Sequence, residues 1–218
     1  MGTQVKICGL TSREAVAAAL EARADFGGLV FHAASPRHLS FEQARALAAH
    51  MRGRTRIVAL FADGGDAEMA GAIAAVKPDL IQLHGSETPS RVAHLRAKFK
   101  LPVIKSVAIA DAADVATAHA YEDVADYLLF DAKAPAKAAR PGGHGAAFDW
   151  KLLSGVRFKL PWLLAGGLTK DNVANAIGIS GAKIVDVSSG VEDAPGKKNP
   201  EKIIAFAKAA RDATVGAA

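Results

Sequence analysis

The chain of 218 residues contains only one cysteine, Cys8. A lone cysteine cannot form an internal disulfide and cannot by itself build a thiolate metal site. No run of about 18 uninterrupted apolar residues occurs, so the sequence predicts no membrane-spanning helix. Aromatic residues make up 6% of the chain, and no basic run is interleaved with them. These absences exclude a disulfide-stapled scaffold and argue against membrane and nucleic-acid partners.

Neither sign of charge dominates, because 27 basic residues stand against 22 acidic ones and leave a formal net charge of +5. Half of the residues are hydrophobic, which is the composition of a soluble globular protein. The pI of about 9.4 permits an anionic partner, but this small charge on a chain of this length does not indicate one. The first residues lack the long apolar stretch of a signal peptide, so we expect a cytoplasmic location.

Short runs of apolar and β-branched residues recur at regular intervals along the chain. We expect strands to begin near Gln4, Phe26, Thr55, Asp79, Pro102, Asp126, Trp162 and Lys183. Segments with helical periodicity lie between them, over Ser12–Ala24, Phe41–His50, Asp66–Val76, Pro89–Phe99, Asp111–His119, Phe148–Ser154, Asp171–Ile177 and Pro200–Asp212. This alternation predicts an α/β protein whose parallel strands are joined by helical crossovers.

Eight evenly spaced strand–helix units in a chain of this length favour a single (βα)8 TIM barrel. We therefore expect one domain over residues 1–218, with an open doubly wound sheet as the alternative. The largest irregular stretch, Ala132–Ala147, follows the predicted sixth strand. An active-site loop would lie there in a barrel.

Two reactive side chains end predicted strands of this barrel, where functional residues of the fold gather. Cys8 ends the first strand and Asp131 ends the sixth. The two-residue period of a strand allows both to point inward, so they can face each other across a bound substrate. Each also has a structural interpretation, since a lone cysteine in a strand usually packs in a core and an aspartate at a strand end often caps a loop.

Three further polar residues are placed for ligand binding at the same end of the barrel. Arg37 follows the second strand, His84 ends the fourth, and Asp186 lies in the eighth. Arg37 can also be a solvated loop cation, and His84 a hydrogen-bonded structural histidine. Their clustering at one rim favours a binding role for all three.

Two glycine-bearing turns follow the last two predicted strands. They contain Gly166 and Gly167 after the seventh strand and Ser188, Ser189 and Gly190 after the eighth. The loops at these two positions of a TIM barrel frequently bind phosphate through backbone N–H groups. The turns therefore predict a small phosphorylated ligand, although ordinary turn glycines would look the same.

These residues belong to an ordered series of motifs that covers nearly the whole chain and resembles the phosphoribosylanthranilate isomerase family of tryptophan biosynthesis. The series is Lys6-Ile7-Cys8-Gly9-Leu10, Phe31, Ser35-Pro36-Arg37, Gln82-Leu83-His84-Gly85, Leu129-Phe130-Asp131, Gly142-Gly143-His144-Gly145, Phe148-Asp149-Trp150, Ala165-Gly166-Gly167-Leu168, Asp186-Val187-Ser188-Ser189-Gly190-Val191-Glu192 and Pro195-Gly196-Lys197-Lys198. His144 departs from the pattern, because a smaller residue is usual there.

The resemblance implies a cofactor-free Amadori rearrangement of N-(5-phosphoribosyl)anthranilate to 1-(2-carboxyphenylamino)-1-deoxyribulose 5-phosphate. It implies that Asp131 is the general acid and Cys8 the general base, and it places His84 near the substrate. Arg37 would pair with the anthranilate carboxylate. Asp186 would hold the substrate nitrogen or, since strand eight adjoins strand one in a closed barrel, pair with Lys6.

The ordinary pKa values of the two catalytic groups do not suit these roles, since an aspartic acid ionises near 3.9 and a thiol near 8.5. Burial would raise the carboxyl pKa, and a nearby cation would lower the thiol pKa. Lys6 lies on the same strand face as Cys8 and is the candidate cation. We also expect Cys8 to be accessible at the mouth of the barrel.

Two other functions remain open at this stage. One is another sugar-phosphate enzyme on the same fold, such as indole-glycerol-phosphate synthase, which would need a lysine acid in place of the Cys8 and Asp131 pair. The other is a non-catalytic barrel that binds a phosphorylated ligand and has no need for that pair. We expect no metal and no cofactor, a small phosphorylated substrate as partner, and a monomer or weak homodimer.

Overall fold

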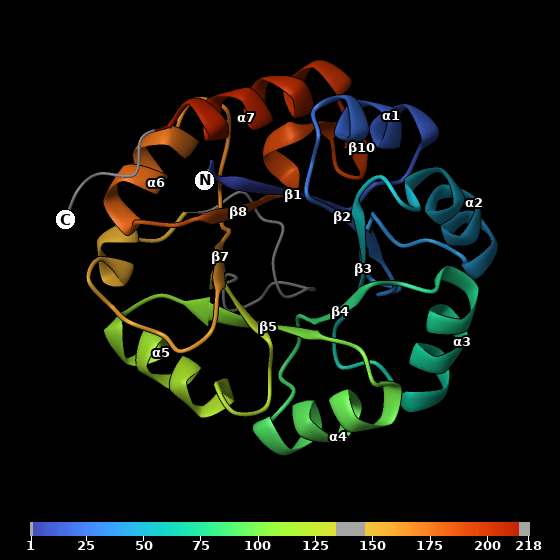
Figure 1. Cartoon of the computed structure of the whole chain (residues 1–218), viewed down its shortest axis with the longest axis horizontal. Coiled ribbons are helices and arrows are strands. Elements are labelled where there is room, and N and C mark those ends of the chain that lie inside the picture. The colour runs from blue at the N-terminus through green and yellow to red at the C-terminus, as the bar shows by residue number, and fades with distance from the viewer. Residues whose placement is uncertain (1, 134–146, 214–218) are drawn as a thin grey trace.

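The computed structural model describes residues 2–133 and 147–213, which form a closed ring of eight parallel strands surrounded by helices (Figure 1). The ring closes because β1 pairs with both β2 and β8. The barrel strands are β1 (Gln4–Cys8), β2 (Phe26–Val30), β3 (Arg56–Phe61), β4 (Leu80–Leu83), β5 (Val103–Ile109), β6 (Tyr127–Ala132), β7 (Trp162–Leu164) and β8 (Ile184–Val187). The predicted TIM barrel is confirmed, and the open sheet is excluded.

The helices lie outside the ring and follow the predicted order. They are α1 (Arg13–Glu21), α2 (Phe41–Met51), α3 (Asp66–Val76), α4 (Pro89–Phe99), α5 (Ala112–Thr117), α6 (Val173–Ser180) and α7 (Pro200–Asp212). Local capping fixes several of their starts. Ser12 accepts a hydrogen bond from the Ala15 N–H, and Ser40 and Gln43 form a reciprocal capping box at the start of α2.

The predicted sixth helix over Phe148–Ser154 is wrong. The structure has a single 3₁₀ turn there, η2 (Trp150–Leu153), with Asp149 accepting a hydrogen bond from the Lys151 N–H. Gly155 follows with φ of 72°, so the chain turns away before a second helical turn forms. The helix predicted over Asp111–His119 is also divided, into α5 and the 3₁₀ turn η1 (Ala118–Tyr121). Most of the irregular stretch Ala132–Ala147, including His144, lies outside the described residues.

Two apolar layers hold the barrel together, and strand alternation separates them. The outer layer lies between sheet and helices and includes Val5, Ile7, Leu29 and Phe31. The inner layer fills the ring with Phe26, Val58, Leu80, Ile104, Leu129, Leu163, Ala165 and Ile184. Because Leu129 points inward, Asp131 two residues later points inward as well. The polar residues at the strand ends therefore stand above a packed apolar floor.

A small antiparallel hairpin after β8 was not expected from the sequence. It consists of β9 (Glu192–Ala194) and β10 (Lys197–Lys198), joined through Gly196. A Cβ atom on Gly196 would lie 2.4 Å from the Pro36 carbonyl oxygen, so the turn is in contact with the segment that carries Arg37. Among the helices that the structure describes, none is long and apolar enough to cross a membrane.

Candidate active site

Cys8 is the last residue of β1 and is buried, with 5% of its surface exposed. It packs against Val30 and Leu60, the last inward residues of the two following strands. A Cβ atom on Gly28, its partner on β2, would lie 3.0 Å from the sulfur, so the thiol is packed tightly against the backbone of β2. The expectation of an accessible thiol is therefore wrong, because the neighbouring strands cover it.

A buried ion pair lies next to Cys8 on the inner face of the ring. Lys6 Nζ is 2.9 Å from Asp186 Oδ1, and the two residues are register partners on β1 and β8. Burial alone would lower the pKa of Lys6, but the adjacent Asp186 carboxylate raises it above its ordinary value. Of the two predicted partners of Asp186, the structure shows Lys6.

The charges around Cys8 do not bring the pKa of its thiol below the ordinary value. Burial raises the pKa of the Cys8 thiol, and the Asp186 carboxylate adds to that effect. The cations of Lys6, Lys198 and Arg37 lower the pKa, but together they do not offset burial. Lys6 thus acts in the predicted direction, while the predicted net result, a lowered thiol pKa, is wrong.

Arg37 is buried and already holds a carboxylate. Its Nε and Nη2 atoms each donate to one oxygen of Glu192 at 2.8 Å, and Lys198 Nζ lies 2.5 Å from Glu192 Oε1. Burial alone would raise the pKa of Glu192, but Arg37 and Lys198 hold it below its ordinary value. Burial lowers the pKa of Lys198, an effect that Glu192 partly offsets. Two cations therefore share a single carboxylate beside Cys8, an arrangement suited to a second anion.

Asp131 lies on β6, which is three strands from β1 by way of β8 and β7. Its side chain contacts His84. His84 Nε2 is 3.2 Å from Asp131 Oδ2, and His84 Nδ1 is 2.9 Å from the amide Nε2 of Gln82. The other Asp131 oxygen accepts a hydrogen bond from the Ala132 N–H at 2.9 Å. The structure thus brings together two residues that the sequence placed separately, a carboxyl group and an imidazole.

The two predicted phosphate loops are packed against each other. A Cβ atom on Gly190 would lie 1.9 Å from the Leu168 carbonyl oxygen, so no other residue permits this approach. Asn172 fixes the first loop, donating to the Gly167 carbonyl and accepting from the Thr169 N–H. The Ser188 hydroxyl donates to the Cys8 carbonyl at 3.1 Å and so supports the end of β1. The Ser188 hydroxyl therefore already has a hydrogen-bond partner in the backbone of β1.

The sequence alone indicated no role for Glu192 or Lys198. Both stood within the motif series, but their pairing depends on the hairpin that folds Lys198 back over Glu192. The burial of Lys198 beside its exposed neighbour Lys197 separates two residues that look identical in sequence. Among the described residues, no group of three His, Cys, Asp or Glu side chains is placed to hold a metal ion.

Comparisons with known proteins agree on one family. Residues 5–209 match the family model described as N-(5'phosphoribosyl)anthranilate (PRA) isomerase. The chain is 53% identical over 211 residues to an N-(5'-phosphoribosyl)anthranilate isomerase of Rhodopseudomonas palustris (strain BisA53), covering 97% of each chain.

Two solved structures show the same architecture. One is a phosphoribosyl anthranilate isomerase in complex with reduced 1-(o-carboxyphenylamino)-1-deoxyribulose 5-phosphate, with 31% identity and a TM-score of 0.80. The other contains monomers generated from the dimeric enzyme of Thermotoga maritima, with 31% identity and a TM-score of 0.81. Each match covers 95% of this chain and 98% of the other.

Proposed function

The chain belongs to the phosphoribosylanthranilate isomerase family, and from this membership we propose how its own residues carry out the reaction. The activity is the isomerisation of N-(5'-phosphoribosyl)anthranilate in tryptophan biosynthesis, an aldose–ketose conversion. The observation that carries the proposal is the placement of a thiol and a carboxyl group on one inner face. Cys8 and Asp131 end strands on different sides of the ring, above the same apolar floor.

The first step is proton donation by Asp131. The proton goes to the ribose ring oxygen, the C1–O bond breaks, and the nitrogen lone pair forms an iminium ion at C1. His84 fixes the donor, because Nε2 lies 3.2 Å from Asp131 Oδ2. With its proton on Nε2, the imidazole donates to Asp131 Oδ2 while Nδ1 accepts from the Gln82 amide N–H, so the proton of the carboxyl group stays available for the ribose ring oxygen.

The second step is removal of the C2 proton by Cys8. This step gives an enolamine, which tautomerises to the ketone. The Asp186 carboxylate is one of the groups that raise the thiol pKa. An iminium ion held near Asp186 offsets that negative charge and favours the thiolate electrostatically. The base is thus activated after the acid has acted.

The anthranilate carboxylate binds at the Arg37 and Lys198 cations. Arginine presents a planar fork that matches a carboxylate bidentately. Glu192 occupies the Nε and Nη2 edge of that fork, so the substrate carboxylate takes the remaining edge or displaces Glu192. The cluster consists of two cations and one carboxylate and becomes electrically neutral when the substrate carboxylate arrives.

The 5-phosphate binds at the paired loops that follow β7 and β8. Backbone N–H groups of Gly166, Gly167, Ser188, Ser189 and Gly190 are the donors that we assign to it. Support for this site comes from the contact between Gly190 and the Leu168 carbonyl, which joins the two loops into one surface.

We retain several sequence predictions as proposals. The chain forms a single catalytic domain over residues 1–218, works in the cytoplasm without metal or cofactor, and has neither nucleic-acid nor membrane partners. We propose a monomer or weak homodimer, while the Thermotoga maritima relative is dimeric. The phosphorylated substrate is the partner that the site is built to hold.

The test is a direct assay of the purified chain. Loss of the fluorescence of N-(5'-phosphoribosyl)anthranilate should follow its addition, in the presence of a metal chelator and without added cofactor. Tight binding of the reduced product analogue without any turnover would favour a non-catalytic phosphate-binding barrel instead.

A further inference from the structure

A further buried ion pair lies outside the ring, on the helix-facing side of β5. Lys105 Nζ is 2.7 Å from Glu87 Oε2, and each side chain is 3% exposed. Lys105 shares a face of β5 with Val103 and Val107, which belong to the outer layer, so it points toward the helices and away from the substrate side of the sheet. The reaction described above uses neither charge.

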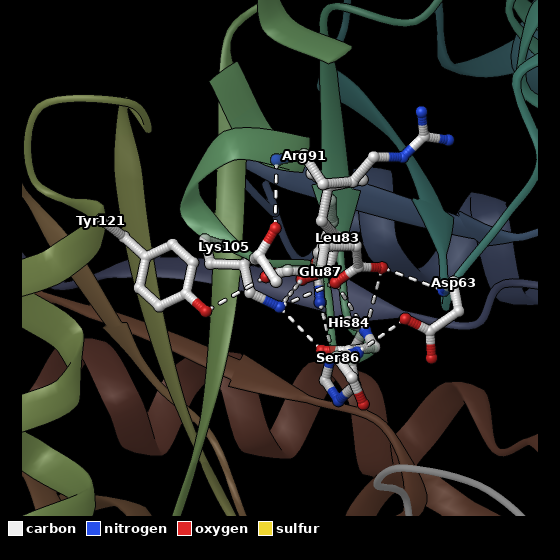
Figure 2. A network of polar contacts seen from close by, with 11 residues as sticks. Asp63, Leu83, His84, Ser86, Glu87, Arg91, Lys105 and Tyr121 are labelled. Atoms are coloured by element: carbon white, nitrogen blue, oxygen red, sulfur yellow. Dashed lines mark hydrogen bonds and ion pairs between the residues drawn. The ribbon is translucent and has the colours of Figure 1, made fainter. Parts of the chain in front are cut away.

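Lys105 and Glu87 form hydrogen bonds with the backbone on both sides of His84 (Figure 2). Lys105 Nζ donates to the Gly85 carbonyl at 2.7 Å and approaches the Leu83 carbonyl at 3.4 Å. Glu87 accepts the Gly85 N–H at 3.0 Å through Oε2. The residues immediately before and after His84 are therefore tied to one buried pair.

Further contacts tie the same loop to its neighbours (Figure 2). Glu87 Oε1 accepts the Asp63 N–H at 2.9 Å, and Asp63 Oδ1 accepts the Ser86 N–H at 2.8 Å. Tyr121 donates its hydroxyl to the Glu87 carbonyl at 3.1 Å. A Cβ atom on Gly85 would lie 2.5 Å from Asp63 Cγ, so the two loops are in contact at this glycine. The loop after β4 is thus anchored to β3, β5 and the turn after α5.

Stability alone does not account for this pair. Two charges removed from water cost about as much free energy as their attraction returns, and apolar residues of similar size often serve as well. Position accounts for it better, since any displacement of the backbone on either side of His84 would also move its side chain. His84 must reach both Gln82 and Asp131, and small displacements of a catalytic hydrogen bond are costly.

We propose that Lys105 and Glu87 are positioning residues, which hold His84 in hydrogen-bond contact with Asp131 from outside the barrel. The inference rests on the proposed role of Asp131 as the acid. Neither residue touches the substrate, and both act through the backbone of Leu83 and Gly85.

The test is the neutral double variant Lys105→Met with Glu87→Gln. Removing both charges avoids a lone buried ion, so the protein should fold with near wild-type stability in urea. The carbonyls around His84 lose their donor, and kcat should fall by about 10-fold to 10²-fold with KM little changed. The ¹⁵N signals of the His84 ring, assigned with His84→Gln, should move toward those of an imidazole that exchanges freely between tautomers.

Val92→Ala is the matched control. Val92 is a buried residue of α4, the helix that follows this loop, and its substitution leaves both charges in place. It should lower stability while kcat and the His84 signals stay as in the wild type. If kcat instead follows stability across both variants, the pair is merely structural and the proposal fails.

Glu87→Asp covers the case in which the double variant does not fold. The charge remains, but the shorter side chain cannot reach both Lys105 and the Gly85 N–H, so a smaller loss of kcat and the same shift of the His84 signals are expected. Unchanged His84 signals with wild-type kcat would overturn the inference. In that event an inactive Asp131→Asn would still support the proposed acid, whereas an active one would overturn the acid itself.

Discussion

The two sides of the active site are built in different ways. The Cys8 side is crowded with buried charge, since Lys6, Asp186, Arg37, Glu192 and Lys198 all lie around the thiol or the adjoining mouth of the barrel. On the Asp131 side, the imidazole of His84 contacts both Asp131 and the Gln82 amide. The nearby ion pair of Lys105 and Glu87 lies on the helix-facing side of the sheet.

With the proposed roles of Cys8 and Asp131, this difference represents two ways of preparing a proton-transfer group. The thiol responds to the sum of several opposing charges, so a substrate that adds a charge changes its ionisation. The Asp131 carboxyl group depends on its contacts with His84 and with the Ala132 N–H, so the geometry of a few hydrogen bonds prepares it. We therefore expect charge-neutralising variants to act mainly on Cys8, and backbone-loosening variants to act mainly on Asp131.

The largest effect is expected on the Asp131 side. Asp131→Asn keeps the shape of the side chain and a contact with His84 but cannot donate the required proton. Loss of a general acid lowers kcat by about 10²–10⁴, which the fluorescence assay will measure. Affinity for the reduced product analogue should be retained, and the exposed Asp123→Asn should behave as the wild type. Near wild-type turnover would transfer the acid role to His84.

Arg37→Ala is expected to have the next largest effect, and it acts on binding. Loss of a charge-assisted bidentate contact costs about 2 kcal/mol, or roughly 30-fold in affinity for an analogue that carries the aryl carboxylate. Calorimetry will measure it. An analogue without the carboxylate should bind the variant and the wild type about equally, and an equal loss for both compounds would rule out Arg37 as the carboxylate partner.

A shift of the thiol pKa is expected on removal of the Lys6 charge. Lys6 lowers the thiol pKa more than Asp186 raises it, so Lys6→Met with Asp186→Asn should leave that pKa higher than in the wild type. Iodoacetamide can react only at Cys8, and the rate of its reaction against pH reports the thiolate. In the wild type the rate should rise only above the ordinary thiol range near 8.5. An identical profile in the variant would remove Lys6 from the control of the base.

The smallest effect is expected from Lys198→Met, which removes a more weakly acting cation. The midpoint of the alkylation profile should again move upward, but by less than removal of the Lys6 charge alone would move it. Lys197→Met is the matched control, because the two lysines are neighbours on β10 and only Lys198 is buried. Equal shifts in the two variants would mean that net charge, and not the placement of Lys198, affects the thiol.

Most of the fold could be predicted from the sequence, because hydrophobic periodicity sets the strands and helices. The helices over Asp66–Val76, Pro89–Phe99 and Pro200–Asp212 were predicted at the observed boundaries. Phe148–Ser154 failed because its apolar spacing resembles that of a helix, while the following Gly155 ends the turn after four residues. The hairpin at Glu192 was missed because two-residue strands have no periodic pattern.

The site was predictable in its members but not in its pairings. Alternation along a strand showed that Lys6 and Cys8 share a face, yet the net thiol pKa depends on burial by β2 and β3, which sequence spacing does not measure. The contact between His84 and Asp131 joins two strands that are not neighbours. Lys105 did leave a signal, a charged residue inside the apolar run from Val103 to Ile109, but its partner Glu87 could be found only through the fold.

The closure of the ring between β1 and β8 has a consequence for how the protein is made. Lys6 and its partner Asp186 are separated by 180 residues in the chain, so a ribosome synthesises Lys6 long before it reaches Asp186. Until β8 is added, the ammonium group of Lys6 lacks its Asp186 partner and cannot be buried as part of an ion pair. Incomplete chains should therefore remain open at this seam, and the order of synthesis itself delays the assembly of the base until the last strand is in place.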